Sequence, residues 1–203
     1  MTQVLAIRSS ATGANSVTNA LIDHYLADYA AHHADATVVE RNLDLDPIAH
    51  IHADTLAGIG RPAPETEAAK PVRLLSDALI AELSTADLLV IGAPMYNFGI
   101  PTTLKSWFDH VLRAGATFNY TAEGPEGLMK GKRALIITAR GGIYSTGPSA
   151  ANDFVVPHLR TLLGFMGITD VTVIYAEGMA YGPEAAAKAV AGAQAELKQA
   201  AAL

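Results

Sequence analysis

Leu88–Pro101 reads Leu-Leu-Val-Ile-Gly-Ala-Pro-Met-Tyr-Asn-Phe-Gly-Ile-Pro, and this stretch decides the fold that we expect. Its first half is a short apolar run, typical of a strand buried on both faces of a parallel sheet. Pro94 disfavours helix at the residue before it, so the residues that follow should form a loop at the strand's carboxyl end. Ligands bind at that edge of an open α/β sheet. The Met95–Phe98 loop, with two aromatic rings and one amide, suits a flat heteroaromatic ligand, although its aromatics would equally cap a core.

Composition limits the classes of function. The chain has 203 residues, of which 50% are hydrophobic, a net charge of −6 and no cysteine. Its length favours one domain, residues 1–203, and its charge argues against a nucleic-acid or anionic-membrane partner. Without cysteine, redox chemistry requires a bound organic cofactor. No apolar run approaches a signal peptide or the ~20 residues of a membrane span, so we expect a soluble, cytoplasmic protein.

A second ligand-binding loop follows the first expected strand, Val4–Ile7. The loop over residues 8–18 is rich in hydroxyls, and a helix should begin near Ser16. Free amides and the positive end of a helix dipole favour a phosphate there. The loop is neither a P-loop nor Gly-x-Gly-x-x-Gly, so a terminal monophosphate fits best. An ordinary N-cap would explain Ser16 alone, but not Ser9, Ser10 and Thr18.

The next part of the chain alternates again between strand and helix. Thr37–Leu43 is more polar and predicts an edge strand, while residues 44–71 predict a long irregular connection with one short helix. Apolar residues from Val72 to Leu83 predict a helix that leads into the central strand. His50 and His52 have the spacing of half a metal site, but we identify no further ligand and expect no metal.

The second half predicts two more strands and a third candidate loop. Apolar residues recur at helical spacing over Thr102–Leu112, and Thr102 is the expected cap of this helix. Apolar and polar residues alternate over Thr117–Thr121, until Glu123–Gly127 interrupts the pattern. The remaining elements are a strand at Arg133–Ala139, a helix at Phe154–Met166, a strand at Val171–Tyr175 and a closing helix at Ala185–Leu203. The fourth strand ends in Arg140-Gly141-Gly142, whose glycines either admit a ligand close to the backbone or form a tight turn.

Five strands alternating with helices predict an α/β fold, a doubly wound parallel sheet with helices on both faces. In the strand order 2-1-3-4-5, the loops after the first, third and fourth strands are neighbours. Their convergence on one pocket would match the switch point that binds FMN in flavodoxin-like folds.

The sequence resembles the bacterial FMN-dependent NADH:quinone oxidoreductases and azoreductases over essentially its whole length. The motifs that carry the resemblance are Ser9–Ser10, Ser16–Thr18, Ala93–Phe98, Arg113–Gly115, Gly124–Leu128, Arg140–Gly142, Gly167–Val171 and Ala176–Gly178. The resemblance implies FMN contacts at Ser10, Ser16, Val17, Thr18, Met95, Tyr96, Asn97, Phe98, Ala139, Arg140, Gly141 and Gly142. Ala139 stands where the family often has Ser or Thr, and Thr18 replaces a common Ser.

The resemblance also implies the reaction. NADH or NADPH would pass a hydride to flavin N5, and a quinone or azo compound would then take two electrons in a ping-pong cycle. No side chain is assigned as catalytic. Phe118, Tyr120, Phe154 and Phe165 are candidates to line the substrate slot, although core or interface packing explains them equally well.

We further expect a homodimer with the two sites at the subunit interface, as the family resemblance also implies. The apolar residues assigned to that interface are Trp107, Phe108, Phe154, Phe165 and Met166. The alternative functions are a flavodoxin-type electron carrier and a nucleotide-binding regulatory domain. The charge excess is mild for a carrier, and neither dinucleotide fingerprint is present.

Overall fold

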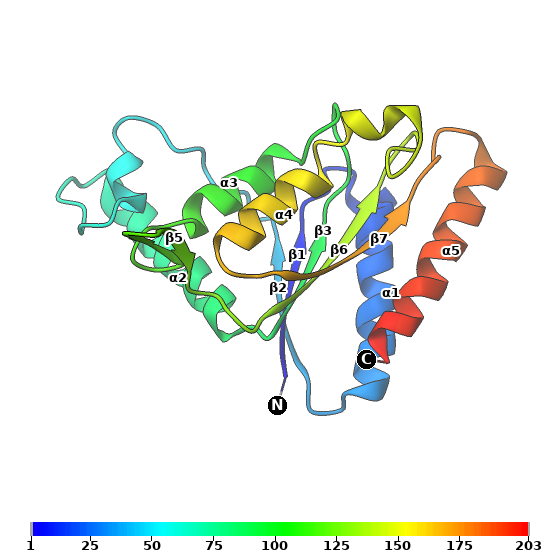
Figure 1. Ribbon diagram of the computed structural model, residues 1–203, viewed down its shortest axis with the longest axis horizontal. Helices are drawn as coiled ribbons and strands as arrows, with labels where there is room; N and C mark the ends of the chain where they lie inside the picture. The colour runs from blue at the N-terminus through cyan, green and yellow to red at the C-terminus, as the bar shows by residue number, and fades with distance from the viewer. Residues whose placement is uncertain (1, 203) are drawn as a thin grey trace.

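The computed structural model describes residues 2–202 and contains one central five-stranded parallel sheet (Figure 1). Its strands are β1 (Gln3–Arg8), β2 (Thr37–Asn42), β3 (Leu88–Gly92), β6 (Arg133–Ala139) and β7 (Asp170–Ala176). Their order is β2-β1-β3-β6-β7, which confirms the predicted order 2-1-3-4-5 for the sheet strands. All of β3 is buried, as the apolar run predicts, whereas β2 lies at an edge and is mostly exposed.

Helices cover both faces of the sheet. They are α1 (Val17–His32), α2 (Ala69–Thr85), α3 (Thr102–Val111), α4 (Val156–Phe165) and α5 (Pro183–Ala201). Figure 1 shows α1 and α5 on one face and α2, α3 and α4 on the other. Successive side chains of a strand point to opposite faces, so Leu5 and Ile7 join one core while Val4 and Ala6 join the other. This arrangement is the doubly wound one that the sequence predicts.

A small antiparallel hairpin lies outside the main sheet. It pairs β4 (Phe118–Thr121) with β5 (Gly124–Gly127), and the sequence predicts only its first strand. Pro125 stands in β5, which is possible because a two-stranded ribbon leaves the missing amide on an outer edge. Gly127 is needed for packing, because a Cβ there would lie 2.1 Å from the amide nitrogen of Gly167.

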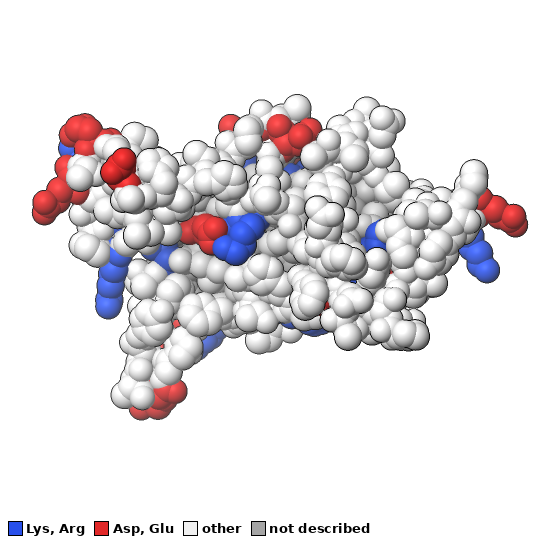
Figure 2. Space-filling model, turned by 90° about the horizontal axis from the view of Figure 1, so that it is seen from above, with Lys and Arg blue, Asp and Glu red and all other residues white. Residues whose placement is uncertain are grey.

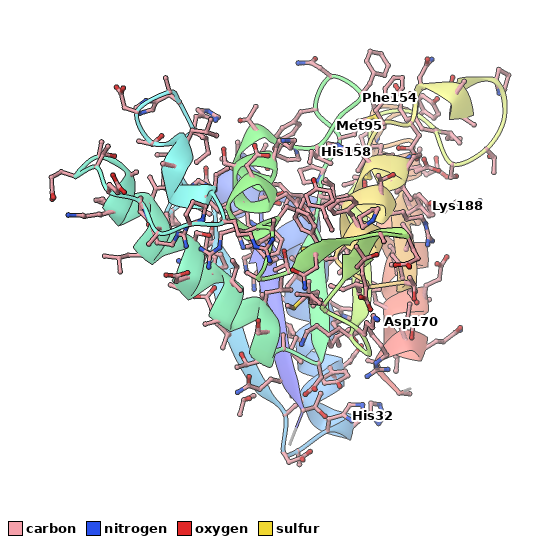
Figure 3. All side chains as sticks on the ribbon, turned by 60° about the vertical axis from the view of Figure 1, so that its left-hand side comes forward. His32, Met95, Phe154, His158, Asp170 and Lys188 are labelled. Atoms are coloured by element: carbon pink, nitrogen blue, oxygen red, sulfur yellow. The ribbon has the colours of Figure 1, made fainter. Side chains whose placement is uncertain are left out.

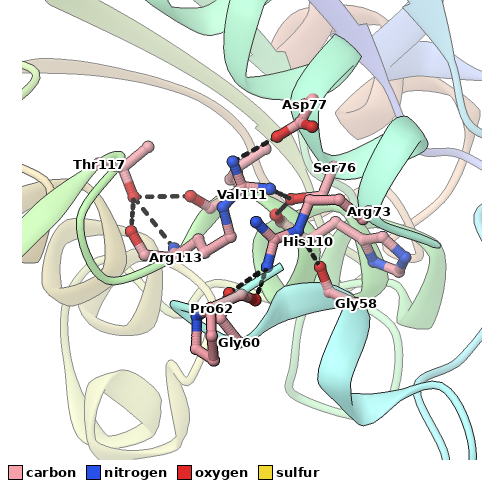
Figure 4. A network of polar contacts seen from close by, with 10 residues as sticks. All are labelled: Gly58, Gly60, Pro62, Arg73, Ser76, Asp77, His110, Val111, Arg113 and Thr117. Carbon is pink, nitrogen blue, oxygen red and sulfur yellow. Dashed lines mark hydrogen bonds and ion pairs between the residues drawn. The ribbon is translucent and has the colours of Figure 1, made fainter. Parts of the chain in front are cut away.

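The long connection before α2 is anchored by one arginine. Residues 43–68 contain a single 3₁₀ turn, Leu56–Ile59, as the composition predicts. Arg73 donates from Nε to the Gly58 carbonyl at 2.8 Å and from Nη2 to the Pro62 carbonyl at 2.7 Å, and also bonds the Gly60 carbonyl (Figure 4). The Arg73 side chain therefore attaches the backbone of residues 58–62 to α2.

A second arginine ties α2 to the end of α3. Arg113 donates to Ser76 Oγ at 2.8 Å and pairs with Asp77, while Ser76 Oγ donates to the His110 carbonyl at 2.6 Å (Figure 4). His50 lies 3.1 Å from Ser106 Oγ, and residues 2–202 contain no group of three or more His, Cys, Asp or Glu arranged to hold a metal ion.

Several predicted boundaries are wrong by a few residues. α2 begins at Ala69, because Pro71 falls in its first turn, where the missing amide proton costs nothing. Thr102 is the first residue of α3 and makes no cap, and Pro101 occupies the cap position. α4 begins at Val156, after a 3₁₀ turn at Pro148–Asn152, so Phe154 precedes it. The predicted end of the closing helix, Leu203, lies outside the described residues. None of the helices within 2–202 is long and apolar enough to span a bilayer.

Candidate active site

The hydroxyl loop meets the first turn of α1 at the carboxyl edge of the sheet. Ser16 is the N-cap, and its Oγ accepts from the Asn19 amide at 3.1 Å. The Ser16 amide bonds the Gly13 carbonyl at 3.1 Å. The first four amides of a helix have no partner within it. With these two satisfied, no contact among residues 2–202 accounts for the amides of Val17 and Thr18. Ser16 is thus the predicted cap, and two donors remain beside it.

Other hydroxyls of this loop have different tasks. Ser9 Oγ donates to the Gly92 carbonyl at 2.6 Å and so joins β1 to β3. Ser10 Oγ lies 3.0 Å from Thr12 Oγ1 and 3.3 Å from the Tyr96 hydroxyl. Thr18 Oγ1 lies 3.1 Å from Ser16 Oγ. Ser9 is therefore structural, whereas Ser10, Ser16 and Thr18 form a polar surface around the helix start.

The loop after β3 makes a tight turn at an unusual backbone geometry. Tyr96 and Gly99 exchange two backbone hydrogen bonds, of 3.0 and 3.1 Å, around Asn97 and Phe98. Both of these residues have positive φ, 48° and 72°, which a primed hairpin turn requires and which is strained for a bulky side chain. The Tyr96 hydroxyl accepts from the Ala11 amide at 3.0 Å, which holds this loop against the hydroxyl loop.

The loop after β6 completes the convergence. The Met95 amide donates to the Ala139 carbonyl at 3.0 Å, and the Met179 amide donates to the Arg140 carbonyl at 3.0 Å. The Arg140 side chain is completely buried and pairs with Asp153 and Glu177. Its guanidinium lies 5.0 Å from the centre of the Tyr175 ring. Burial raises the pKa of Tyr175 above its usual value, and the nearby Arg140 charge opposes that rise.

These three loops surround one cavity of about 220 Å³. Its lining consists of Ser10, Thr12, Asn15, Ser16, Val17, Thr18, Pro94, Met95, Tyr96, Ala139, Arg140, Gly141 and Met179. Of the residues implied to bind FMN, only Asn97, Phe98 and Gly142 are not in this lining. Thr12, Asn15 and Pro94 belong to loops that the sequence already singles out, whereas Met179 follows β7 and has no local signal.

The candidate substrate residues do not share one place. Phe118 packs against Phe165 with ring centroids 4.6 Å apart and against Tyr120 at 5.3 Å, which makes a cluster on the hairpin. None of the three lines the cavity. Phe154 is 58% exposed, and its amide donates to the Phe98 carbonyl at 3.1 Å. Figure 3 shows Phe154 and Met95 together at the carboxyl edge, with His32 and Asp170 at the opposite end.

The surface around the cavity carries little charge. Figure 2 looks onto the carboxyl edge; its middle is mostly uncharged apart from one adjacent pair of opposite charges and an acidic group at the rim, and many of the other charged side chains lie toward the ends. Arg140 is the only Lys or Arg among the residues that line the cavity, and its side chain is buried. Such a site suits a flat ligand with one anionic end.

Comparisons with known proteins agree with this geometry. Residues 2–201 match a family model for the flavodoxin-like fold. A relative from Hyphomonas neptunium, an FMN-dependent NADH:quinone oxidoreductase, is 50% identical over 97% of this chain and 94% of its own length. A relative of the same name from Yersinia pestis is 48% identical over 98% of both chains.

Solved structures give the same picture. An azoreductase from Bacillus anthracis has a TM-score of 0.92 at 32% identity and covers 100% of this chain and 99% of its own. An FMN-dependent NADH-azoreductase from Bacillus anthracis, in complex with FMN, has a TM-score of 0.89 at 27% identity, covering 98% and 97%. This chain therefore belongs to the flavodoxin-like family of FMN-dependent NADH:quinone oxidoreductases and azoreductases.

Proposed function

We propose that this chain is an FMN-dependent enzyme that oxidises NADH and reduces quinones and azo compounds two electrons at a time. The observation that carries this proposal is the single cavity formed where the loops after β1, β3 and β6 meet. Two relatives that are 50% and 48% identical to the chain are named FMN-dependent NADH:quinone oxidoreductases, and these names support the choice of donor and acceptor.

The phosphate of FMN would occupy the start of α1. The amides of Val17 and Thr18 are donors left over from the helix, and the buried hydroxyls of Ser16 and Thr18 stand beside them. Together with the helix dipole, these groups suit a dianionic monophosphate without lysine or metal. The residues present therefore fit the cofactor.

The flavin ring would lie at the outer rim of the cavity. A volume of about 220 Å³ is below the ~300–1,000 Å³ that encloses a whole ligand, so it suits the phosphate and ribityl end. Met95 and Tyr96 line the wall next to the exposed turn at Asn97 and Phe98. We assign Asn97 to the polar edge of the ring, where an amide can both donate and accept.

FMN, when bound, would supply the redox chemistry, which is hydride transfer from NADH at flavin N5 and two-electron reduction of the acceptor. The chain's residues would position the cofactor: Ser16 and Thr18 would hold the phosphate, Met95 and Tyr96 would contact the ring, and Asn97 would meet its polar edge. A single stacking place would serve donor and acceptor in turn, which implies that the oxidised nicotinamide leaves before the acceptor enters.

The alternative function, a flavin electron carrier without its own substrate, lacks comparable support. A carrier presents its flavin edge to a protein partner through a strongly charged surface, whereas the middle of the carboxyl edge is largely uncharged (Figure 2). The names of the relatives also describe enzymes with a small-molecule donor.

Replacing the phosphate-side hydroxyls tests the placement of FMN. Ser16→Gly with Thr18→Val should weaken FMN binding to the apoprotein by about two orders of magnitude, because charge-assisted hydrogen bonds are lost. Glycine is a tolerated N-cap and costs only a few tenths of a kcal/mol, so the apoprotein should stay folded. Thr85→Val, at the end of α2, is the matched hydroxyl control. Parental affinity in the double variant, measured by quenching of flavin fluorescence, would refute the assignment.

A further inference from the structure

Arg140 lines the cavity, yet its side chain is completely buried. Its guanidinium has no exposed surface and lies among three polar side chains. Nη1 donates to Asp153 Oδ2 at 2.9 Å and to Glu177 Oε1 at 3.3 Å, and Nε donates to Thr138 Oγ1 at 3.3 Å. The side chains of Asp153 and Glu177 are only 9% and 11% exposed. Arg140 is therefore the shared counter-ion of two nearly buried carboxylates.

Each carboxylate holds the backbone of a different loop. Asp153 Oδ1 accepts from the amides of Val155 and Val156, at 2.9 and 3.1 Å, and so fixes the start of α4. Glu177 Oε1 accepts from the amides of Tyr144 and Ser145, at 2.8 and 2.9 Å. Glu177 thereby holds the loop that follows Gly141–Gly142, while its own backbone follows β7.

The same cluster is connected to the strained turn. Phe154 follows Asp153 directly, and its amide donates to the Phe98 carbonyl at 3.1 Å. The rings of Phe98 and Tyr144 meet edge to face with centroids 6.1 Å apart. The loops after β3, β6 and β7 and the start of α4 therefore all meet at one buried ion cluster.

We propose that Arg140 is a positioning residue for FMN: its guanidinium, through Asp153 and Glu177, holds these loops in the arrangement that fits the flavin. Both carboxylates bond the same nitrogen, so without Arg140 they would face each other as unpaired, desolvated like charges. The loops would relax by moving apart. This inference rests on the proposed placement of FMN in the cavity and adds to it a reason why an arginine stands at this position.

A neutral version of the cluster separates positioning from folding. Arg140→Met combined with Asp153→Asn and Glu177→Gln removes the charges together, while both amide side chains keep an oxygen for the backbone amides. Removing all three charges together avoids leaving any of them buried and unpaired, so the apoprotein should stay folded and melt closer to the parent than Arg140→Met alone does. Its affinity for FMN should nevertheless fall about tenfold or more, since the loops are no longer held by charge.

Arg140→Lys is the second variant, because it keeps the charge but loses the Nε donation to Thr138 Oγ1 and the planar guanidinium over the Tyr175 ring. We expect a smaller loss of FMN affinity with an unchanged melting temperature. Arg41→Met is the matched control: Arg41 also bridges two carboxylates, Glu82 and Asp46, but it does not line the cavity. Its variant should bind FMN like the parent.

The reduction potential of bound FMN gives an independent measurement. Arg140→Met alone leaves two uncompensated carboxylates near the ring, so the potential should become more negative, because reduced flavin carries negative charge. A purely structural role would not shift the potential in this direction.

The outcomes are distinguishable. Parental FMN affinity in the neutral triple variant, or in Arg140→Lys if the triple variant does not fold, overturns the role of Arg140. If Ser16→Gly with Thr18→Val also binds FMN like the parent, the proposed placement of FMN fails instead. An unchanged potential in Arg140→Met contradicts the role of Arg140 as the counter-ion of both carboxylates.

Discussion

Asn97 and Phe98 hold a backbone conformation that costs free energy. Positive φ is tolerated by Asn but strained for Phe, and it costs of the order of 1–3 kcal/mol where the surroundings impose it. The hydrogen bonds between Tyr96 and Gly99 impose it here, and they leave Phe98 48% exposed, two residues after Tyr96 of the cavity wall. Strain of this kind is typical of ligand-binding turns.

Asn97→Gly separates the backbone role of this residue from the role of its amide. Glycine accepts positive φ freely, so the melting temperature of the apoprotein should stay the same or rise. Hydride transfer should slow and the flavin potential should shift, because the side-chain amide is lost. Stopped-flow reduction by NADH and a thermal melt measure the two effects. Normal kinetics in a destabilised variant would mean that Asn97 serves only the turn.

Arg73 provides the attachment of the long connection to α2. It donates to three backbone carbonyls between Gly58 and Pro62, and a hydrogen bond to a charged group contributes roughly 1.5–3 kcal/mol net. Arg73→Met should therefore release residues 43–68 without unfolding the sheet. We expect much faster limited proteolysis within this segment and a nearly unchanged cleavage pattern elsewhere. Arg61→Met is the control, and equal cleavage rates in both variants would show that Arg73 is not the anchor.

The packing of α1 on the sheet makes the free energy of unfolding depend on pH in the alkaline range. Burial, with a smaller effect of Tyr29, raises the pKa of Tyr25 to about 12. The unfolded chain loses this proton near pH ~10, so between these values the folded state binds more protons and the free energy of unfolding falls as pH rises. Tyr25→Phe should show a shallower fall over that window in denaturant titrations. Identical slopes in both proteins would contradict the raised pKa.

Helices and strands were predictable where the hydrophobic periodicity and the Gly, Pro or capping residues at the ends indicate the same element. The apolar runs of β1, β3 and β6 and the stripe of α3 are recovered within one or two residues. β5 was missed because Gly and Pro have low strand propensity, and only pairing with β4 makes it a strand. Most of the cavity was likewise predictable from its loops. Met179 and the inward direction of Arg140 were not, because both depend on contacts between β6 and β7 that no local pattern encodes.

The structure corrects the residues assigned to a subunit interface. Trp107, Phe108 and Met166 are fully buried in the core of their own chain, whereas Phe165 is half-buried against Phe118 and its place in an interface stays a prediction. Phe154 is the most exposed of the five. The apolar side chains that are exposed around the cavity belong to the loops themselves, namely Phe98, Ile143 and Phe154.

A homodimer remains a prediction, now resting on these loop residues. A flavin ring at the rim of a small cavity would be open to water, and a second subunit over Phe98 and Phe154 would close the slot with an interface above ~1,000 Å². Sedimentation at micromolar concentration should give a dimer, and Phe154→Glu should weaken it. Leu74→Glu, at an exposed position on α2, is the control. An active monomer of 21.2 kDa would contradict this arrangement.

Anaerobic mixing of the FMN-loaded chain with NADH tests the central claim most directly. If donor and acceptor use one flavin site in turn, NADH alone should bleach the flavin completely in a single exponential phase. The oxidised nicotinamide should then be free in solution, and a quinone added afterwards should restore the yellow colour. A flavin that stays oxidised with NADH until the acceptor is also present would contradict the account.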